Sequence, residues 1–121
     1  MSEHIKFFII FIFAVLMFCG CGRQYKAEAV VKEFLDNNLQ ADAYTVSFQE
    51  IDSTKNVTDS VVDVMRLEAG KNKMFRKGIA YAPINRQYIY VQAKVCVGND
   101  TINHTFYINP ELTRIVSFKV N

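Results

Sequence analysis

The stretch that decides the fold is YIYVQAKVCVGNDTINHTFYI, residues 88–108 of the chain. Apolar and polar side chains alternate on both sides of Gly98-Asn99, and such alternation is the pattern of half-buried strands. Glycine accepts a positive φ at the first central position of a two-residue turn, so this dipeptide predicts a hairpin. The resulting register pairs Val95 with Ile102, Val91 with Phe106, Cys96 with Thr101, and Ala93 with His104.

A third strand follows the hairpin. Pro110 fixes φ in a turn at Asn109-Pro110-Glu111, and Leu112–Val120 is again rich in β-branched and aromatic residues. We therefore expect three consecutive strands in an antiparallel meander. Its apolar face would carry Ile89, Val91, Ala93, Val95, Val97, Ile102, His104, Phe106 and Ile108.

Two segments upstream of the meander have helical spacing. Tyr25–Leu39 places apolar residues three and four positions apart, which predicts one apolar stripe able to cover the sheet. Asp59–Phe75 has the same spacing in its first half, and Gly78 is its expected stop. Between them, Tyr44–Ile51 alternates and predicts a further strand. The polar residues 52–56 after it are expected to form a turn.

The order of these elements predicts an α+β fold. The N-terminal helix packs on a curved antiparallel sheet of about four strands, and a second helix is expected between the strands. In element order the chain resembles the cystatin-like and nuclear-transport-factor-like rolls, in which a helix packs across a curved sheet. This resemblance implies a conical pocket that can host a small ligand or acid/base residues.

The start of the chain has the pattern of an export signal. Lys6 precedes the apolar run Phe7–Phe18, whose twelve residues would span about 18 Å as a helix, against about 30 Å of bilayer hydrocarbon. The following Gly20-Cys21 pair resembles the lipobox of bacterial lipoproteins. This resemblance implies cleavage before Cys21, a lipid on its thiol and an acyl chain on its new amino group. An ordinary secreted protein and an uncleaved membrane anchor are the alternatives.

These patterns divide the chain into three parts. We expect a lipoprotein signal peptide over residues 1–20, a lipid-anchored Cys21 with a short tether over residues 21–24, and a single domain over residues 25–121. The domain would lie in the cell envelope, outside the cytoplasm, held to the membrane by the lipid. A net charge of +2 does not indicate a nucleic-acid partner. Cys96 is the one thiol left after processing, so no internal disulfide is expected.

Catalysis by the remaining thiol and imidazole is not expected. The predicted register points Cys96 and His104 to opposite faces of the sheet, whereas a nucleophile and its base need hydrogen-bond reach. A histidine on an apolar face is more often a core residue than a ligand. One histidine without a clustered cysteine or carboxylate cannot fill a zinc shell. We therefore expect no catalytic residue, no metal site and no cofactor.

The polar face of the hairpin is the candidate binding surface, carried by Tyr88, Tyr90, Lys94 and Tyr107. Tyrosines interleaved with amides and a lysine can bind a protein or a sugar-like ligand, although they are also ordinary on an amphipathic outer face. The leading hypothesis is a non-catalytic binding module whose partner is an envelope protein, a glycan or a small apolar ligand. One alternative is a small enzyme or ligand binder with a pocket formed by His104, Arg114 and a carboxylate such as Glu50. A purely structural envelope protein is the third hypothesis.

Overall fold

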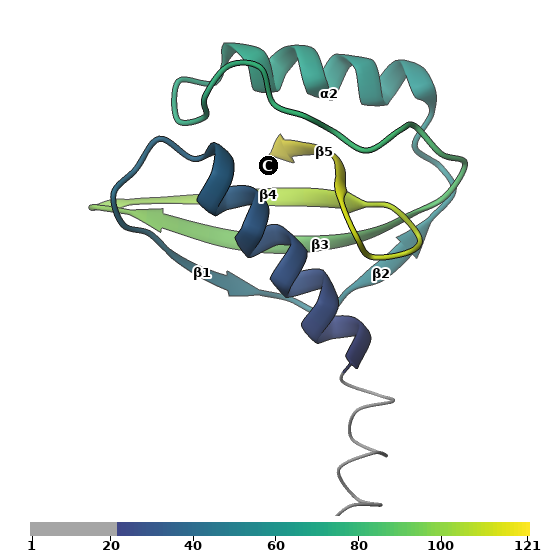
Figure 1. Cartoon of the computed structure of the whole chain (residues 1–121), viewed down its shortest axis with the longest axis horizontal. Coiled ribbons are helices and arrows are strands. Elements are labelled where there is room, and N and C mark those ends of the chain that lie inside the picture. The colour runs from purple at the N-terminus through teal and green to yellow at the C-terminus, as the bar shows by residue number, and fades with distance from the viewer. Residues whose placement is uncertain (1–21) are drawn as a thin grey trace, which may run out of the picture.

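The computed structural model describes residues 22–121, so the predicted signal peptide and the lipid site at Cys21 lie outside the described residues. Within that range the chain forms two helices and a five-stranded antiparallel sheet (Figure 1). The predicted α+β fold, with an N-terminal helix on a sheet, is confirmed. Neither described helix is long and apolar enough to cross a membrane. In chain order the elements are the N-terminal helix (residues 22–38), β1 (Thr45–Phe48), β2 (Asp52–Thr54), α2 (Asp59–Lys71), β3 (Tyr88–Val97), β4 (Asp100–Ile108) and β5 (Ile115–Val120).

Strands β3 and β4 form the hairpin that the sequence predicts. The register pairs Val95 with Ile102 and Val91 with Phe106. Gly98 turns the chain with a φ of 60°, which glycine adopts without a Cβ clash. The strand order β1-β3-β4-β5 places this hairpin at the centre of the sheet.

Strand β5 begins three positions later than predicted, at Ile115 instead of Leu112. The Asn109 side chain holds the intervening residues in a loop, because its Oδ1 accepts hydrogen bonds from the backbone N–H groups of Thr113 and Arg114. Strand β5 then pairs with β4 through a bulge beside Tyr107 and Ile108. A bulge adds one residue to one strand and so changes which side chains share a face.

The edge next to β3 differs from the prediction. Asp52–Thr54, expected as a turn, forms β2 and pairs with β3 beyond the end of β1. Polar residues suit this position because an edge strand pairs on one side only and exposes its side chains. The break between β1 and β2 is closed by Gln24, whose Oε1 accepts from Ile51 N–H and whose Nε2 donates to the Gln49 carbonyl, both at 2.9 Å. Residues 22–24, expected as a tether, are therefore part of the helix and fixed to the sheet.

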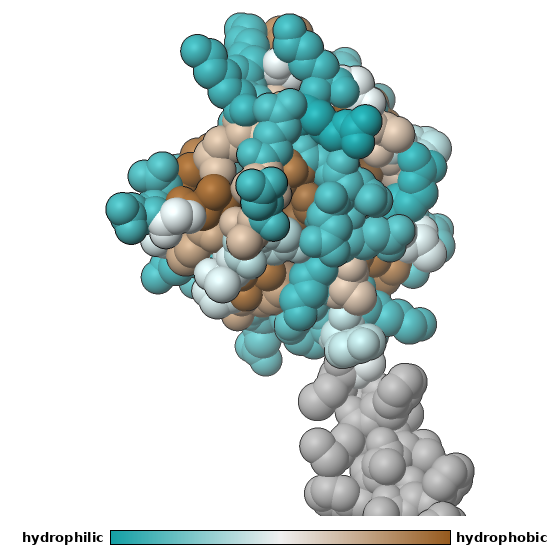
Figure 2. Space-filling view, turned by 60° about the vertical axis from the view of Figure 1, so that its left-hand side comes forward, coloured by the Kyte–Doolittle hydropathy of each residue, from teal (hydrophilic) through white to brown (hydrophobic). Residues whose placement is uncertain are grey.

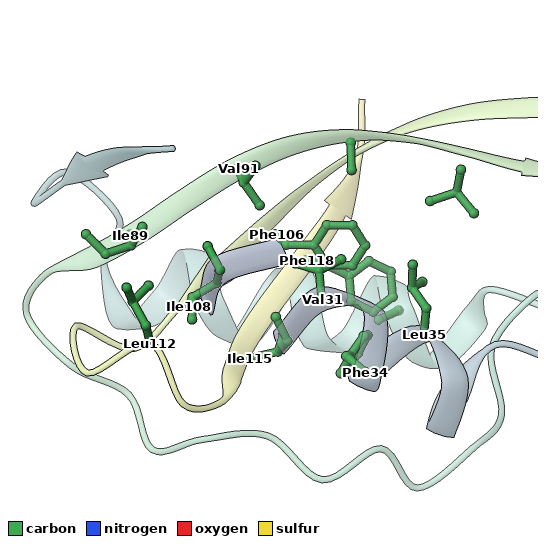
Figure 3. Close-up of a cluster of buried hydrophobic side chains, with 14 of the residues drawn as sticks. Val31, Phe34, Leu35, Ile89, Val91, Phe106, Ile108, Leu112, Ile115 and Phe118 are labelled. Carbon is green, nitrogen blue, oxygen red and sulfur yellow. The ribbon is translucent and has the colours of Figure 1, made fainter. Parts of the chain in front are cut away.

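The N-terminal helix crosses the inner face of the sheet, which is the face that carries Val91 and Phe106 (Figure 1). The ring of Phe34 meets those of Phe118 and Phe106 at centroid distances of 5.6 and 6.1 Å. The predicted helix stripe therefore forms the main core (Figure 3), with Ala27, Val31, Phe34 and Leu35 buried in it. Several members at the margin of this core are only partly buried. Figure 2 brings the left-hand side of Figure 1 forward and shows hydrophobic residues at the surface between hydrophilic ones.

Helix α2 lies along β5, at the opposite edge of the sheet from β1 and β2 (Figure 1). Its N-cap is Thr58, whose hydroxyl accepts a hydrogen bond from Val61 N–H. The helix continues through Gly70 to Lys71, so it is longer than the predicted first half and ends before Gly78. The outer face is the side of the sheet opposite the N-terminal helix. There, Val62 and Met65 of α2 pack in a second cluster with Tyr88, Tyr107 and Val116.

Candidate binding site

The candidate binding surface is only partly open. Tyr88 is completely buried and Tyr107 is 8% exposed, because α2 covers their end of the outer face. The Tyr88 hydroxyl donates to the Asn85 carbonyl at 2.7 Å and accepts from Asn85 N–H at 2.9 Å. The expectation that Tyr88 and Tyr107 belong to an open face is therefore wrong. Of the four predicted residues, Tyr90 is half-buried and Lys94 is exposed, so these two remain accessible on the outer face.

Two rows of the outer face that run across the strands lie next to the part covered by α2. The register brings Ser47, Lys94 and Asn103 into one row. It brings Gln92, Thr105 and Lys119 into the next row. Because side chains of one face recur every two residues, neighbouring rows are about 7 Å apart. We call these two rows the outer groove.

The surface is hollowed along both rows. One hollow of about 340 Å³ is lined by residues of the outer rows and by Phe48, Ala93 and His104, the inner-face row between them. Its lining is Ser47, Phe48, Gln49, Gln92, Ala93, Lys94, Asn103, His104 and Asn121. A second hollow of about 260 Å³ is lined by Thr54, Tyr90, Gln92, Thr105, Tyr107 and Lys119. Gln92 lines both hollows, so the two adjoin at this side chain. The outer groove therefore crosses the sheet from β1 to β5.

The polar groups of the groove are two lysine ammonium groups, which only donate, and amides and hydroxyls, which donate and accept. Lys94 and Lys119 are exposed, and in the described part of the chain neither lies within ion-pair distance of a carboxylate. The side chains of Gln92 and Asn103 are exposed as well and make no hydrogen bond within residues 22–121. Thr105 differs, because its buried hydroxyl donates to Asn121 Oδ1 at 2.8 Å. No acidic residue is among those that line the two hollows.

Cys96 and His104 lie on opposite sides of the sheet, as the register predicts. The Cys96 thiol is on the outer face, 3.4 Å from the Thr101 hydroxyl. His104 is completely buried on the inner face against the rings of Phe75, Phe106 and Phe118. The two groups therefore cannot act together.

The His104 ring is held as a neutral core residue. Its Nδ1 lies 3.2 Å from the Ile102 carbonyl, so a proton on Nδ1 makes this hydrogen bond, while Nε2 has no hydrogen-bond partner within the described residues. Burial lowers the pKa of His104 below its usual value, and the hydrogen bond to the carbonyl opposes that shift only in part.

The residues of the alternative pocket are not brought together. His104 is enclosed by phenyl rings, whereas Arg114 donates from Nη2 to the Tyr81 carbonyl at the surface, and Glu50 is exposed. The rings of Phe34, Phe106 and Phe118 fill the space between the N-terminal helix and the sheet. Residues 22–121 also contain no group of three histidine, cysteine or acidic side chains placed to hold a metal ion.

Three residues of the groove were not predicted from the sequence: Ser47, Asn103 and Lys119. Ser47 and Asn103 lie in the same row as Lys94, and their positions follow from strand pairing alone. The place of Lys119 in the groove could not be predicted from the sequence, because its partner on β4 depends on the bulge at the start of β5. No signal in the sequence marks that bulge.

Comparison with protein-family models, with curated proteins and with solved structures finds no match to this chain.

Proposed function

We propose that this chain is a lipid-anchored protein of the bacterial cell envelope that acts by non-catalytic binding through its outer groove. The anchor rests on the Gly20-Cys21 pair and the short apolar run before it. The binding function rests on the groove. Two lysines and two amides stand there on rigid strands without partners of their own in the described chain. A ligand can therefore bond to these donors and acceptors without first displacing a partner within the described chain.

The contact between the N-terminal helix and the β1–β2 edge supports a lipid anchor close to the domain. The helix runs from residue 22, and Gln24 fixes its first turn to the break between β1 and β2. A lipid on Cys21 would therefore hold the domain by the β1–β2 edge, with almost no slack in the chain. The outer groove begins at Ser47 on this edge and runs across the sheet to Lys119 on β5, at the edge opposite the anchor.

Site-specific photocrosslinking in intact cells tests this proposal. Asn103, in the middle of the groove, is replaced by benzoylphenylalanine, and Lys26, exposed on the N-terminal helix, receives the same residue as the control. We expect a discrete adduct with envelope material from position 103 and none from position 26. Adducts of equal yield from both positions, or none from position 103, would show that the groove is not the binding surface.

A further inference from the structure

We infer that the ligand of the outer groove is an acidic carbohydrate, a glycan segment that carries carboxylate or phosphate groups among its hydroxyls. This inference rests on the proposed function, since it names the ligand class of the same groove. Three properties of the groove carry it: the sign of its charge, the spacing of its cations and the polarity of the groups between them.

The charge of the groove is positive at two separated points. Lys94 stands on β3 and Lys119 on β5, one row further along. Two strand spacings and one row step put their Cα atoms about 12 Å apart. Neither ammonium group is paired with a carboxylate of the described chain. A ligand with repeated anionic groups can reach both lysines at once and make a charge-assisted hydrogen bond with each.

The surface between the lysines suits hydroxyl groups. Gln92 and Asn103 each offer an amide oxygen and an amide NH₂, so either can donate to and accept from a sugar ring. Tyr90 lines the neighbouring hollow with a half-buried ring, which offers an apolar face with a polar tip. The apolar side chains among the residues that line the two hollows are those of Phe48 and Ala93, beside the rings of Tyr90 and Tyr107. An acidic peptide is separated from an acidic carbohydrate by the titration with hexaglutamate.

Other anionic macromolecules fit less well. Nucleic-acid binding depends on several neutralised phosphates, and the groove presents two lysines in a chain whose net charge is only +2. A bilayer surface is flat, whereas the two lysines flank hollows in the sheet. Two separated lysines with amides between them favour a flexible chain rich in hydroxyls with regularly placed anions.

Calorimetric titration tests the ligand class on the full chain, purified in a polyoxyethylene detergent that carries no sugar. The probes are a galacturonic acid hexamer, a neutral glucose hexamer, glycerol phosphate as a lipid-headgroup analogue, and hexaglutamate. The groove variant is Lys94→Gln with Lys119→Gln. The matched control is Lys55→Gln with Lys77→Gln, which removes the same charge from exposed lysines elsewhere.

We expect the uronic acid hexamer to bind the wild-type chain and the control alike, and to lose about tenfold or more in affinity with the groove variant. Equal losses in both variants would overturn the groove as the site. Equal or tighter binding of the glucose hexamer, glycerol phosphate or hexaglutamate would overturn the acidic-carbohydrate assignment. If no probe binds while position 103 still captures envelope material, the ligand class is wrong and the binding function stands. If position 103 also captures nothing, both fail.

Discussion

Replacing Phe34 by alanine tests the central contact of this fold, the packing of the N-terminal helix on the inner face. Phe34 is 7% exposed and its ring meets four aromatic rings, with centroid distances of 5.6 Å to Phe118, 6.1 Å to Phe106, and 6.3 Å to both Phe75 and Tyr81. The substitution removes the ring from the middle of this group. Its neighbours come from β4, from β5 and from the connection between α2 and β3, so they cannot close the space by moving one element.

The expected loss follows from that geometry. Truncating a buried phenylalanine costs about 3–5 kcal/mol, and the upper half of this range applies where the cavity cannot collapse. A domain of this size has a total stability of about 5–15 kcal/mol, so the variant loses a large share of it. With a urea dependence of about 1.5 kcal/mol per molar, the unfolding midpoint should fall by about 3 M.

The measurement is urea unfolding of the fragment 22–121, followed by far-ultraviolet circular dichroism because the chain has no tryptophan. Lys26→Ala on the exposed face of the same helix is the control, and its stability should change by less than ~0.5 kcal/mol. A midpoint shift for Phe34→Ala as small as that of Lys26→Ala would refute the reasoning. The helix would then not pack on the sheet in solution.

Three further predictions concern single residues. Cys21→Ser should leave an unprocessed precursor that incorporates no labelled palmitate in cells; labelling that persists would move the lipid to another residue or exclude a lipoprotein. Cys96→Ser should leave the stability and the crosslinking yield from position 103 nearly unchanged, because a serine hydroxyl can keep the hydrogen bond with the Thr101 hydroxyl on the outer face; loss of crosslinking by a folded variant would contradict this. His104 should make the domain less stable as the pH falls below about 6.5, because the unfolded chain takes up a proton there that the folded chain, with its lowered pKa, does not. Urea midpoints between pH 7 and pH 5.5 measure this loss, and His104→Phe should reduce it; an unchanged pH dependence in that variant would assign the loss to other groups.

The β3–β4 hairpin and the helix that packs on its inner face could be predicted, because the turn signal and the apolar spacing both favour the observed fold. Gly98-Asn99 fixes the β3–β4 register, and that register alone separates Cys96 from His104. The helix stripe around Phe34 and Leu35 has no other apolar surface of comparable size to cover. The apolar pattern and the turn therefore point to the same arrangement.

The strand expected over Tyr44–Ile51 forms β1, but the rest of that edge and the cover of the outer face could not be predicted, for reasons that belong to tertiary structure. Asp52–Thr54 is a strand only because β3 offers it free backbone groups, and nothing in three polar residues indicates this. Gln24 was predicted to lie in a tether, because nothing in the sequence indicates that its side chain bonds to the backbone between β1 and β2. Tyr88 and Tyr107 alternate as polar-face residues would, yet a tyrosine can bury its ring wherever its hydroxyl finds a partner, and Asn85 provides one for Tyr88.

The position of α2 on the outer face also determines which side chains of that face remain exposed for binding. Its apolar residues take the tyrosine-rich end of the outer face, where Tyr88, Tyr107 and Val116 become a second core. The rows with Lys94 and Lys119 lie beyond the second core and remain exposed. A face that looked in the sequence like an aromatic surface therefore presents cations and amides. The ligand expected from the structure is accordingly anionic and hydrogen-bonding. The expected ligand differs from the one that the sequence suggests because α2 covers the tyrosines and leaves the two lysines exposed.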